Sequence, residues 1–205
     1  MREIIKMIVV LAMIATVSGA SLSFINAKTA GRIKEQRFKY LKEPALTAIL
    51  PEYDNDLVKD TFETMIGEKT YIVYPAKKSG VLKAIAFEID EKSYGGDMSV
   101  MVAMDLEEKR LTGARVTICN DTPGLGLKVT TDEAFINQFS DIPLYDQDGS
   151  DHILSLKKDG GGVDAITGAT ISSSSVLRAV NSAVGIMREH AGEIAEKADR
   201  AGTVK

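Results

Sequence analysis

DAITGATISSSS, residues 164–175, is the stretch around which this chain is organised. It follows a glycine run, 160–162, and leads into apolar residues that recur at the spacing of one helix face: Val176, Val180, Ala183, Val184 and Met187. The serines of this stretch are good N-cap residues, because a hydroxyl oxygen can accept from the free N–H groups of a first helical turn. The stretch therefore predicts a loop that delivers Thr170 to the start of a helix.

Such a helix start is a favourable place for an anion. Unpaired N–H groups and the helix dipole both attract a phosphate. Gly168 and Ala169 are small, so a bulky group can approach the backbone closely. On its physics alone, however, a loop rich in glycine and serine before a helix is more often a simple cap.

Upstream of this stretch, strand patterns follow one another closely. The expected strands are Tyr71–Tyr74, ended by Pro75, and then 81–89, 98–104 and 111–119, with turns over 77–80 and 93–96. Short connections between successive strands predict an antiparallel meander. Flanking helices then make the fold class α+β.

The segments around these strands have weaker patterns. A turn or two of surface helix is expected within residues 54–65, and a short helix over 132–139 with Ala134, Phe135 and Phe139 buried. Residues 153–156 are expected to form a short strand.

The N-terminus carries an apolar run. Residues 7–27 contain no charged side chain, and as a helix at 1.5 Å per residue they would span about 31 Å, close to the thickness of a bilayer core. Arg2 and Lys6 before the run favour a cytoplasmic N-terminus, although basic residues also follow it. The run predicts a single transmembrane anchor, and a cleavable signal peptide is the alternative. In both cases the remainder is expected outside the cytoplasm.

Composition narrows the function classes. A net charge of −4 and the lack of a basic stripe with interleaved aromatic residues argue against nucleic-acid binding. The single cysteine, Cys119, has no partner for an internal disulfide. The two histidines, His152 and His190, match no zinc or haem spacing, so no metal site is expected.

Residues 164–170 resemble the flavinylation motif, Asp-x-x-(Ser/Thr)-Gly-Ala-Thr, of the FMN-binding domain family. This family includes the G subunit of Rnf-type electron transport complexes and the C subunit of the sodium-translocating NADH:quinone reductase. In these proteins the last threonine of the motif carries FMN through a phosphoester bond made by a flavin transferase. The resemblance implies the same covalent FMN on Thr170, with further flavin-site residues at Asp164, Thr167, Gly168, Ala169 and Ser172.

A second part of the resemblance lies upstream. The family has a Glu-Thr-Pro-Gly-Leu-Gly loop before the motif, and five of its six residues occur here: Thr122, Pro123, Gly124, Leu125 and Gly126. Asp121 stands in place of the glutamate and is one methylene shorter. The resemblance implies that this loop contributes to the FMN site, with its two glycines letting backbone N–H groups face the flavin.

The resemblance implies an electron carrier rather than a complete enzyme. The expected protein is a membrane-anchored subunit of an Rnf-type complex, moving electrons between ferredoxin and NAD with ion translocation. Its expected partners are the other subunits, the flavin transferase and the membrane, with the soluble domain on the periplasmic or extracellular side. A flavin carrier of a quinone reductase or other respiratory complex is the nearer alternative. A flavin-free, membrane-anchored binding module is the more distant one.

The expected organisation has four parts. Residues 1–27 form the anchor, 28–69 a helical linker and stalk, 70–192 the FMN-binding domain, and 193–205 a charged, frayed or solvated tail.

Overall fold

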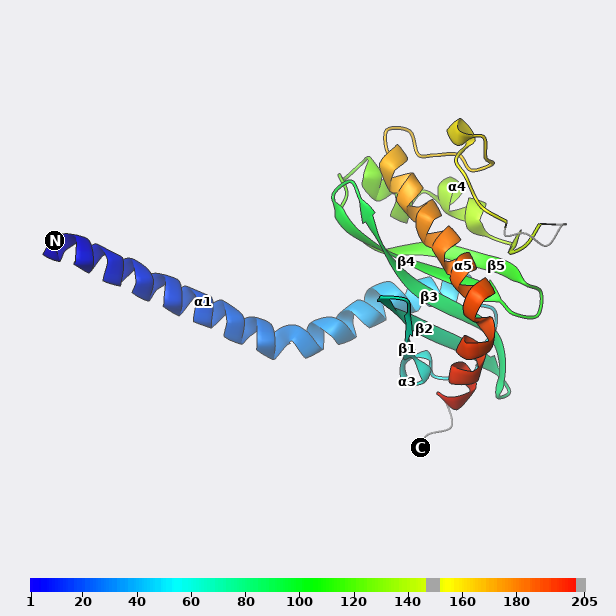
Figure 1. The fold of residues 1–205 in the computed structure, drawn as a ribbon, viewed down its shortest axis with the longest axis horizontal. Helices are drawn as coiled ribbons and strands as arrows, with labels where there is room; N and C mark the ends of the chain where they lie inside the picture. Colours follow the sequence, from blue (N-terminus) through cyan, green and yellow to red (C-terminus); the bar gives the residue numbers. More distant parts are fainter. Residues whose placement is uncertain (147–151, 202–205) are drawn as a thin grey trace. The chain divides into compact units, whose positions relative to one another are not determined.

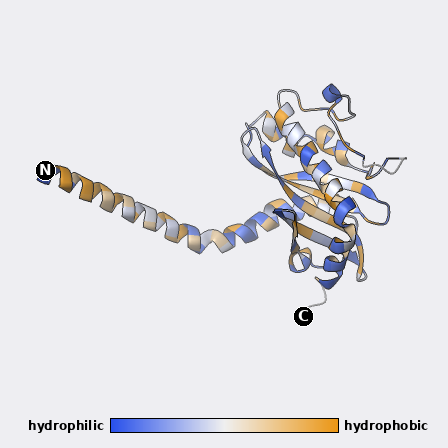
Figure 2. Cartoon of the chain, viewed as in Figure 1, coloured by the Kyte–Doolittle hydropathy of each residue, from blue (hydrophilic) through white to orange (hydrophobic). Residues whose placement is uncertain are grey.

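The computed structural model describes residues 1–146 and 152–201 (Figure 1). The chain divides into two compact units, Met1–Leu41 and a second unit that begins at Lys42. The first unit is built on helix α1, Arg2–Arg37, which buries none of its residues within the structure. After Arg2, Glu3 and Lys6, its N-terminal half is mostly apolar (Figure 2), as expected of a helix whose surroundings are themselves apolar. The helix is long and apolar enough to cross a membrane.

The second unit is built on a six-stranded antiparallel sheet in the order β1-β2-β3-β4-β5-β6. The strands are β1 Phe62–Ile66, β2 Lys69–Lys78, β3 Val81–Ser93, β4 Gly96–Asp105, β5 Arg110–Cys119 and β6 Ile142–Pro143. Each strand pairs with the next one in sequence, which confirms the antiparallel meander and the α+β class. The β2–β3 connection is a two-residue turn, Ser79 and Gly80, in which both residues have positive φ as tight hairpins require.

Helices cover both faces of the sheet. Helix α5, Thr170–Arg200, lies across β3 and β4 on one face of the sheet (Figure 1). Apolar side chains such as Phe87, Val100 and Val180 form the main core. Helix α2, Glu43–Ile49, packs against β4 and β5, and its Ile49 side chain occupies the space that a side chain at Gly113 would need. Before it lies a short π-helical segment, Phe38–Lys42. The remaining short helices are α3 Leu57–Asp60, η2 Gly126–Thr130, α4 Glu133–Ile136, η3 Asn137–Phe139 and η4 Lys157–Asp159.

The expected linker over 28–69 is partly wrong. Its first residues do continue helix α1, but α2 packs on the sheet and Phe62–Ile66 forms edge strand β1 instead of surface helix. Within 54–65 only α3 is helical, capped by the Asp56 carboxylate. The mixed sequence of β1, FETMI, obscures its strand pattern, because an edge strand buries few of its side chains.

Strand β2 continues through Pro75, where the sequence analysis ended it. Strand β1 pairs with β2 only as far as Val73, so Pro75 lies where that side of β2 has no strand partner. Proline is tolerated at such positions because no ladder hydrogen bond is lost. The carbonyl of Pro75 instead accepts from the Asn55 amide at 2.8 Å.

Three smaller expectations are also corrected. Within the expected helix 132–139, residues 133–139 are helical, but Ile136 is buried and Ala134 is exposed. The expected strand over 153–156 is reduced to a single bridge between Leu156 and Val163. The tail from residue 193 was expected to be frayed or solvated. It is instead helical up to Arg200, because α5 continues and buries Ile194 and Ala198 completely.

Candidate functional site

Thr170 is the first residue of helix α5. The N-cap is Ala169, whose side chain caps nothing, so the first-turn N–H groups have no side-chain acceptor there. Thr170 is partly exposed, and its hydroxyl makes no hydrogen bond with any residue among 1–146 and 152–201. The helix start thus joins an available hydroxyl to uncapped N–H groups at the positive end of the dipole.

The serines that follow were expected to cap the helix. They instead lie inside it. Ser172, Ser173 and Ser175 are all buried. The Ser173 hydroxyl accepts from the Ile166 backbone N–H at 3.1 Å and donates to the Ala169 carbonyl at 3.0 Å. Ser173 therefore fastens the preceding loop to the helix.

The turn before the helix is closed by its backbone. Ala169 N–H donates to the Ile166 carbonyl at 2.9 Å, and Gly168 adopts a φ of 78°, which favours glycine. Ile166 and Ala169 are buried, whereas Thr167 and Gly168 are exposed. The turn therefore presents Thr167 and Gly168 outward while its ends are anchored.

The loop 122–126 packs against this turn. The Leu125 and Leu127 N–H groups both donate to the Thr122 carbonyl at 3.2 Å, which closes the loop tightly. A methyl group at Gly168 would lie 3.3 Å from the Leu125 side chain, so the two glycine-containing loops touch. The structure thus brings together two motifs that lie about forty residues apart in sequence.

The two glycines of this loop differ in their surroundings. Gly124 has a φ of 75°, with no other group within 4 Å of where a side chain would begin. Gly126 is buried, and a side chain there would begin 2.6 Å from both the Asp121 Cβ and the Ser172 Oγ. Close packing within the protein therefore explains the glycine at 126.

Asp121, where the sequence departs from the family loop, is almost fully buried. Its carboxylate accepts from the Ser93 hydroxyl at 2.5 Å and from the Gly95 N–H at 2.6 Å. Burial alone would raise the pKa of Asp121, but hydrogen bonds from Ser172, Ser93, Gly95 and Cys119 outweigh it, so the pKa lies below its usual value. The shorter side chain is therefore an ionised group with a full set of partners.

The first residue of the DAITGAT motif is also held. The Gln138 amide accepts from the Asp164 N–H at 2.7 Å and donates to its carbonyl at 3.2 Å, and the Asp164 carboxylate pairs with Lys157 at 2.6 Å. Phe135 and Phe139 precede and follow Gln138 in sequence, and both are buried. Their rings pack edge to face with centroids 5.1 Å apart. The Asp164 side chain itself stays exposed.

These features fit the FMN that the resemblance implies. A phosphoester on Thr170 would meet the N–H groups of α5, since helix starts bind phosphate groups readily. Leu125 and Ile171 beside it are about half exposed, at 48% and 55%, and offer apolar surface to a flat ring. The residues that would hold FMN are therefore Thr170 and the two loops around it.

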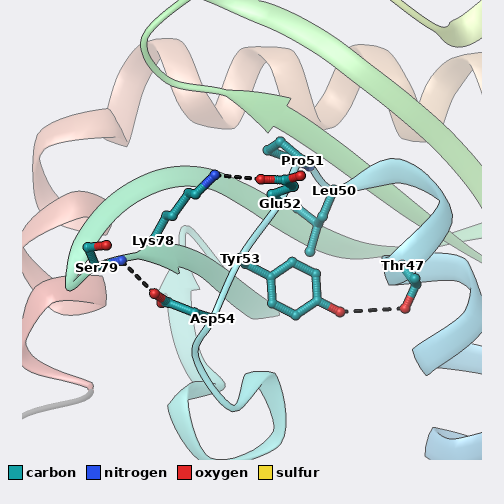
Figure 3. Close-up of a pocket in the computed structure, with 8 residues that line it drawn as sticks. All are labelled: Thr47, Leu50, Pro51, Glu52, Tyr53, Asp54, Lys78 and Ser79. Carbon is teal, nitrogen blue, oxygen red and sulfur yellow. Dashed lines mark hydrogen bonds and ion pairs between the residues drawn. The ribbon is translucent and has the colours of Figure 1, made fainter.

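A separate pocket of about 450 Å³ lies away from these residues (Figure 3). It is lined by Thr47, Leu50, Pro51, Glu52, Tyr53, Asp54, Lys78 and Ser79. Glu52 pairs with Lys78 at 2.5 Å, and the Asp54 carboxylate accepts from the Ser79 N–H at 2.7 Å. Ser79 precedes the start of β3, whereas Ser93 and Asp121 meet at its other end, roughly 40 Å away at 3.3 Å per residue. This pocket is therefore no part of the site around Thr170.

The structure groups most predicted site residues at one end of the sheet. Gly168, Ala169, Thr170 and Ser172 surround the helix start, and Leu125 and Gly126 contact them. Sequence reasoning missed the supporting roles of Ser93, Gln138, Lys157 and Ser173. No spacing rule links these residues to the motif, because their partners are set by the tertiary fold.

Comparisons with known proteins agree with this geometry. Residues 93–185 match the FMN-binding domain family. The chain is 33% identical over 193 residues to the G subunit of the ion-translocating oxidoreductase complex of Methanosarcina acetivorans, covering 93% of this chain and 98% of that protein. It is 30% identical over 179 residues to the G subunit of the complex of the same name from Buchnera aphidicola, covering 83% and 81%.

Among solved structures, the fold resembles the C subunit of the Na(+)-translocating NADH-quinone reductase from Parabacteroides distasonis. The TM-score is 0.50 at 24% identity, over 67% of this chain and 70% of that one. This confirms the fold of the sheet and its helices. Given the sequence relatives and the matched domain, the chain belongs to the family of G subunits of ion-translocating oxidoreductase complexes, and it contains that family's FMN-binding domain.

Proposed function

We propose that this protein is an electron-transfer subunit of a membrane-bound, ion-translocating oxidoreductase complex, and that it carries FMN covalently on Thr170. One observation carries the proposal: Thr170 presents an available hydroxyl at the uncapped start of α5, inside a DAITGAT sequence against which the loop 122–126 packs. When bound, FMN supplies the electron transfer. The protein supplies the tether, the two loops and the dipole of the helix start.

Family membership supports the complex as the setting. The relatives named above are subunits of ion-translocating oxidoreductase complexes. We infer that this chain also works with other subunits, passing electrons between ferredoxin and NAD while ions are moved, and that a flavin transferase attaches its FMN. The quinone-reductase alternative has support only from the shared fold, and the domain match argues against the flavin-free module.

The attachment is tested on the purified full chain, coexpressed with a flavin transferase. We expect yellow protein whose flavin fluorescence stays with the polypeptide after denaturation and electrophoresis. Its intact mass should exceed that of the bare chain by one FMN less one water, since the phosphoester forms with loss of water. Flavin that is released completely on denaturation would contradict the covalent bond while leaving FMN binding in place.

The apolar helix and the family together indicate a membrane-anchored protein. We propose that the residues after the anchor face the periplasm or cell exterior, because Arg2 and Lys6 precede the apolar run and the flavinylation motif that residues 164–170 resemble belongs to exported domains. Single cysteines introduced at Thr29 and Glu189, each with Cys119 replaced by serine, should react with a membrane-impermeant maleimide in intact cells. Labelling that requires lysis at both positions would place the domain in the cytoplasm instead.

A further inference from the structure

Asp121 is a buried carboxylate that connects three separate segments at the site. One oxygen accepts from the Ser93 hydroxyl and the other from the Gly95 N–H, both at the β3–β4 turn. Asp121 itself leads into the loop 122–126, and one of its oxygens lies 3.0 Å from the position of a side chain at Gly126. The Ser172 Oγ in the first turn of α5 lies 2.6 Å from the same position, so it borders the same space as the carboxylate. The hairpin, the loop and the helix start thus converge on one side chain.

Two glycines make this convergence possible. A side chain at Gly95 would begin 2.2 Å from the Asn120 carbonyl oxygen, so the hairpin tip lies directly on the backbone before Asp121. A side chain at Gly126 would begin 2.6 Å from the Ser172 hydroxyl, so the loop lies directly on α5. Contacts this close leave no space for the three segments to move separately while Asp121 holds its partners.

We propose that Asp121 is a positioning residue for the flavin: it does not bind the cofactor but fixes the loop 122–126 over the start of α5, so that a ring tethered at Thr170 is held in one orientation. The inference rests on the proposed function. Its basis is that both carboxylate oxygens already face protein donors, which leaves the group to act through Ser172 and Gly126. Asp121 therefore takes a role different from direct contact with the ligand.

The contacts of Asp121 predict which replacements preserve its role. In Asp121→Asn the amide oxygen can still accept from the Gly95 N–H. The amide nitrogen can donate to the Ser93 and Ser172 hydroxyls, because a hydroxyl both donates and accepts. In Asp121→Ala all these bonds are lost and the loop is released from the helix. Asparagine should therefore substitute for aspartate, and alanine should not.

The experiment compares full-length variants coexpressed with the flavin transferase, with anisotropy of the flavin fluorescence as the readout. Covalent flavin should remain in every variant, since the DAITGAT motif is unchanged. We expect about twofold lower anisotropy in Asp121→Ala, because a released ring rotates within nanoseconds, and a value close to the parent in Asp121→Asn. The midpoint potential of the flavin should change in the alanine variant as its surroundings become more solvated.

Asp90→Ala is the matched control. Asp90 lies on the same strand, β3, and its carboxylate likewise accepts from a serine hydroxyl, that of Ser99, at 2.5 Å. This pair is not part of the site, so its loss should leave the anisotropy at the parental value. If Asp121→Ala does not fold, Ser93→Ala removes one of the same contacts and should lower the anisotropy in the same direction.

The outcomes separate the two proposals. Flavin that is absent from the parent protein would contradict the proposed function. Flavin attached to parent and variant alike, with equal anisotropy and potential in Asp121→Ala or in its substitute Ser93→Ala, would overturn only the positioning role. An equal loss of anisotropy in Asp121→Asn would overturn the hydrogen-bonding account of that role.

Discussion

Thr170→Ala is expected to abolish covalent FMN attachment while leaving the fold intact. The hydroxyl of Thr170 is the oxygen that the phosphoester would require, and alanine has none. The stability of the domain should hardly change, because Thr170 is the first helical residue and not the cap, and its hydroxyl has no partner among the described residues. Alanine also has the higher helix propensity, by roughly half a kcal/mol.

The measurement is intact mass after coexpression with the transferase, followed by peptide mapping. Thr167→Ala is the matched control, because Thr167 is an exposed hydroxyl of the same turn and keeps Thr170 in place. We expect this control to lower the flavin content only partly. An adduct mapped to Ser172 or Ser173, or undiminished in Thr170→Ala, would disprove Thr170 as the attachment site. Both serines are buried, which makes them poor acceptors.

The second large effect concerns stability and lies on the other face of the sheet. Lys42 pairs with Glu88 at 2.6 Å, with side chains only 19% and 7% exposed, and Lys42 also lies 3.5 Å from the Tyr74 hydroxyl. Burial, and next the Glu88 carboxylate, raise the pKa of Tyr74, so the phenol stays neutral. Lys42→Met would leave Glu88 buried without its cation, at a cost of about 3 kcal/mol.

Urea unfolding of the detergent-solubilised chain, followed by tyrosine fluorescence, measures this cost. The double variant Lys42→Met/Glu88→Met should recover most of the lost stability, because an apolar pair of similar volume often replaces a buried ion pair without penalty. Lys83→Met removes the exposed pair with Glu107 and should change stability far less. A Lys42→Met variant as stable as the parent would show that Glu88 is hydrated or finds another partner.

The sequence contained enough information for the main elements of the fold. The alternation and turns of residues 81–119 predicted β4 and β5 to within two residues of their ends, because a central strand buries both faces and so has a strong apolar pattern. They also predicted the start of β3, which continues four residues beyond the expected end, to Ser93. The edge strand β1 could not be found in this way. Its residues, FETMI, mix charged and apolar side chains, and only pairing with β2 makes them a strand.

The same division holds for the candidate site. The resemblance of residues 164–170 and 122–126 to the family motifs singled out Thr170 and its two loops, and local sequence predicted only the turns and the helix start. Contacts between segments remote in sequence place Gly126 against Ser172 and bring the hairpin onto Asp121. Another such contact lets the Gln138 amide bind the Asp164 backbone. The sequence by itself determined the apolar helix and singled out the residues of the candidate site. Only the tertiary structure decided which side chains support that site, because those partners are chosen by how the sheet brings distant segments together.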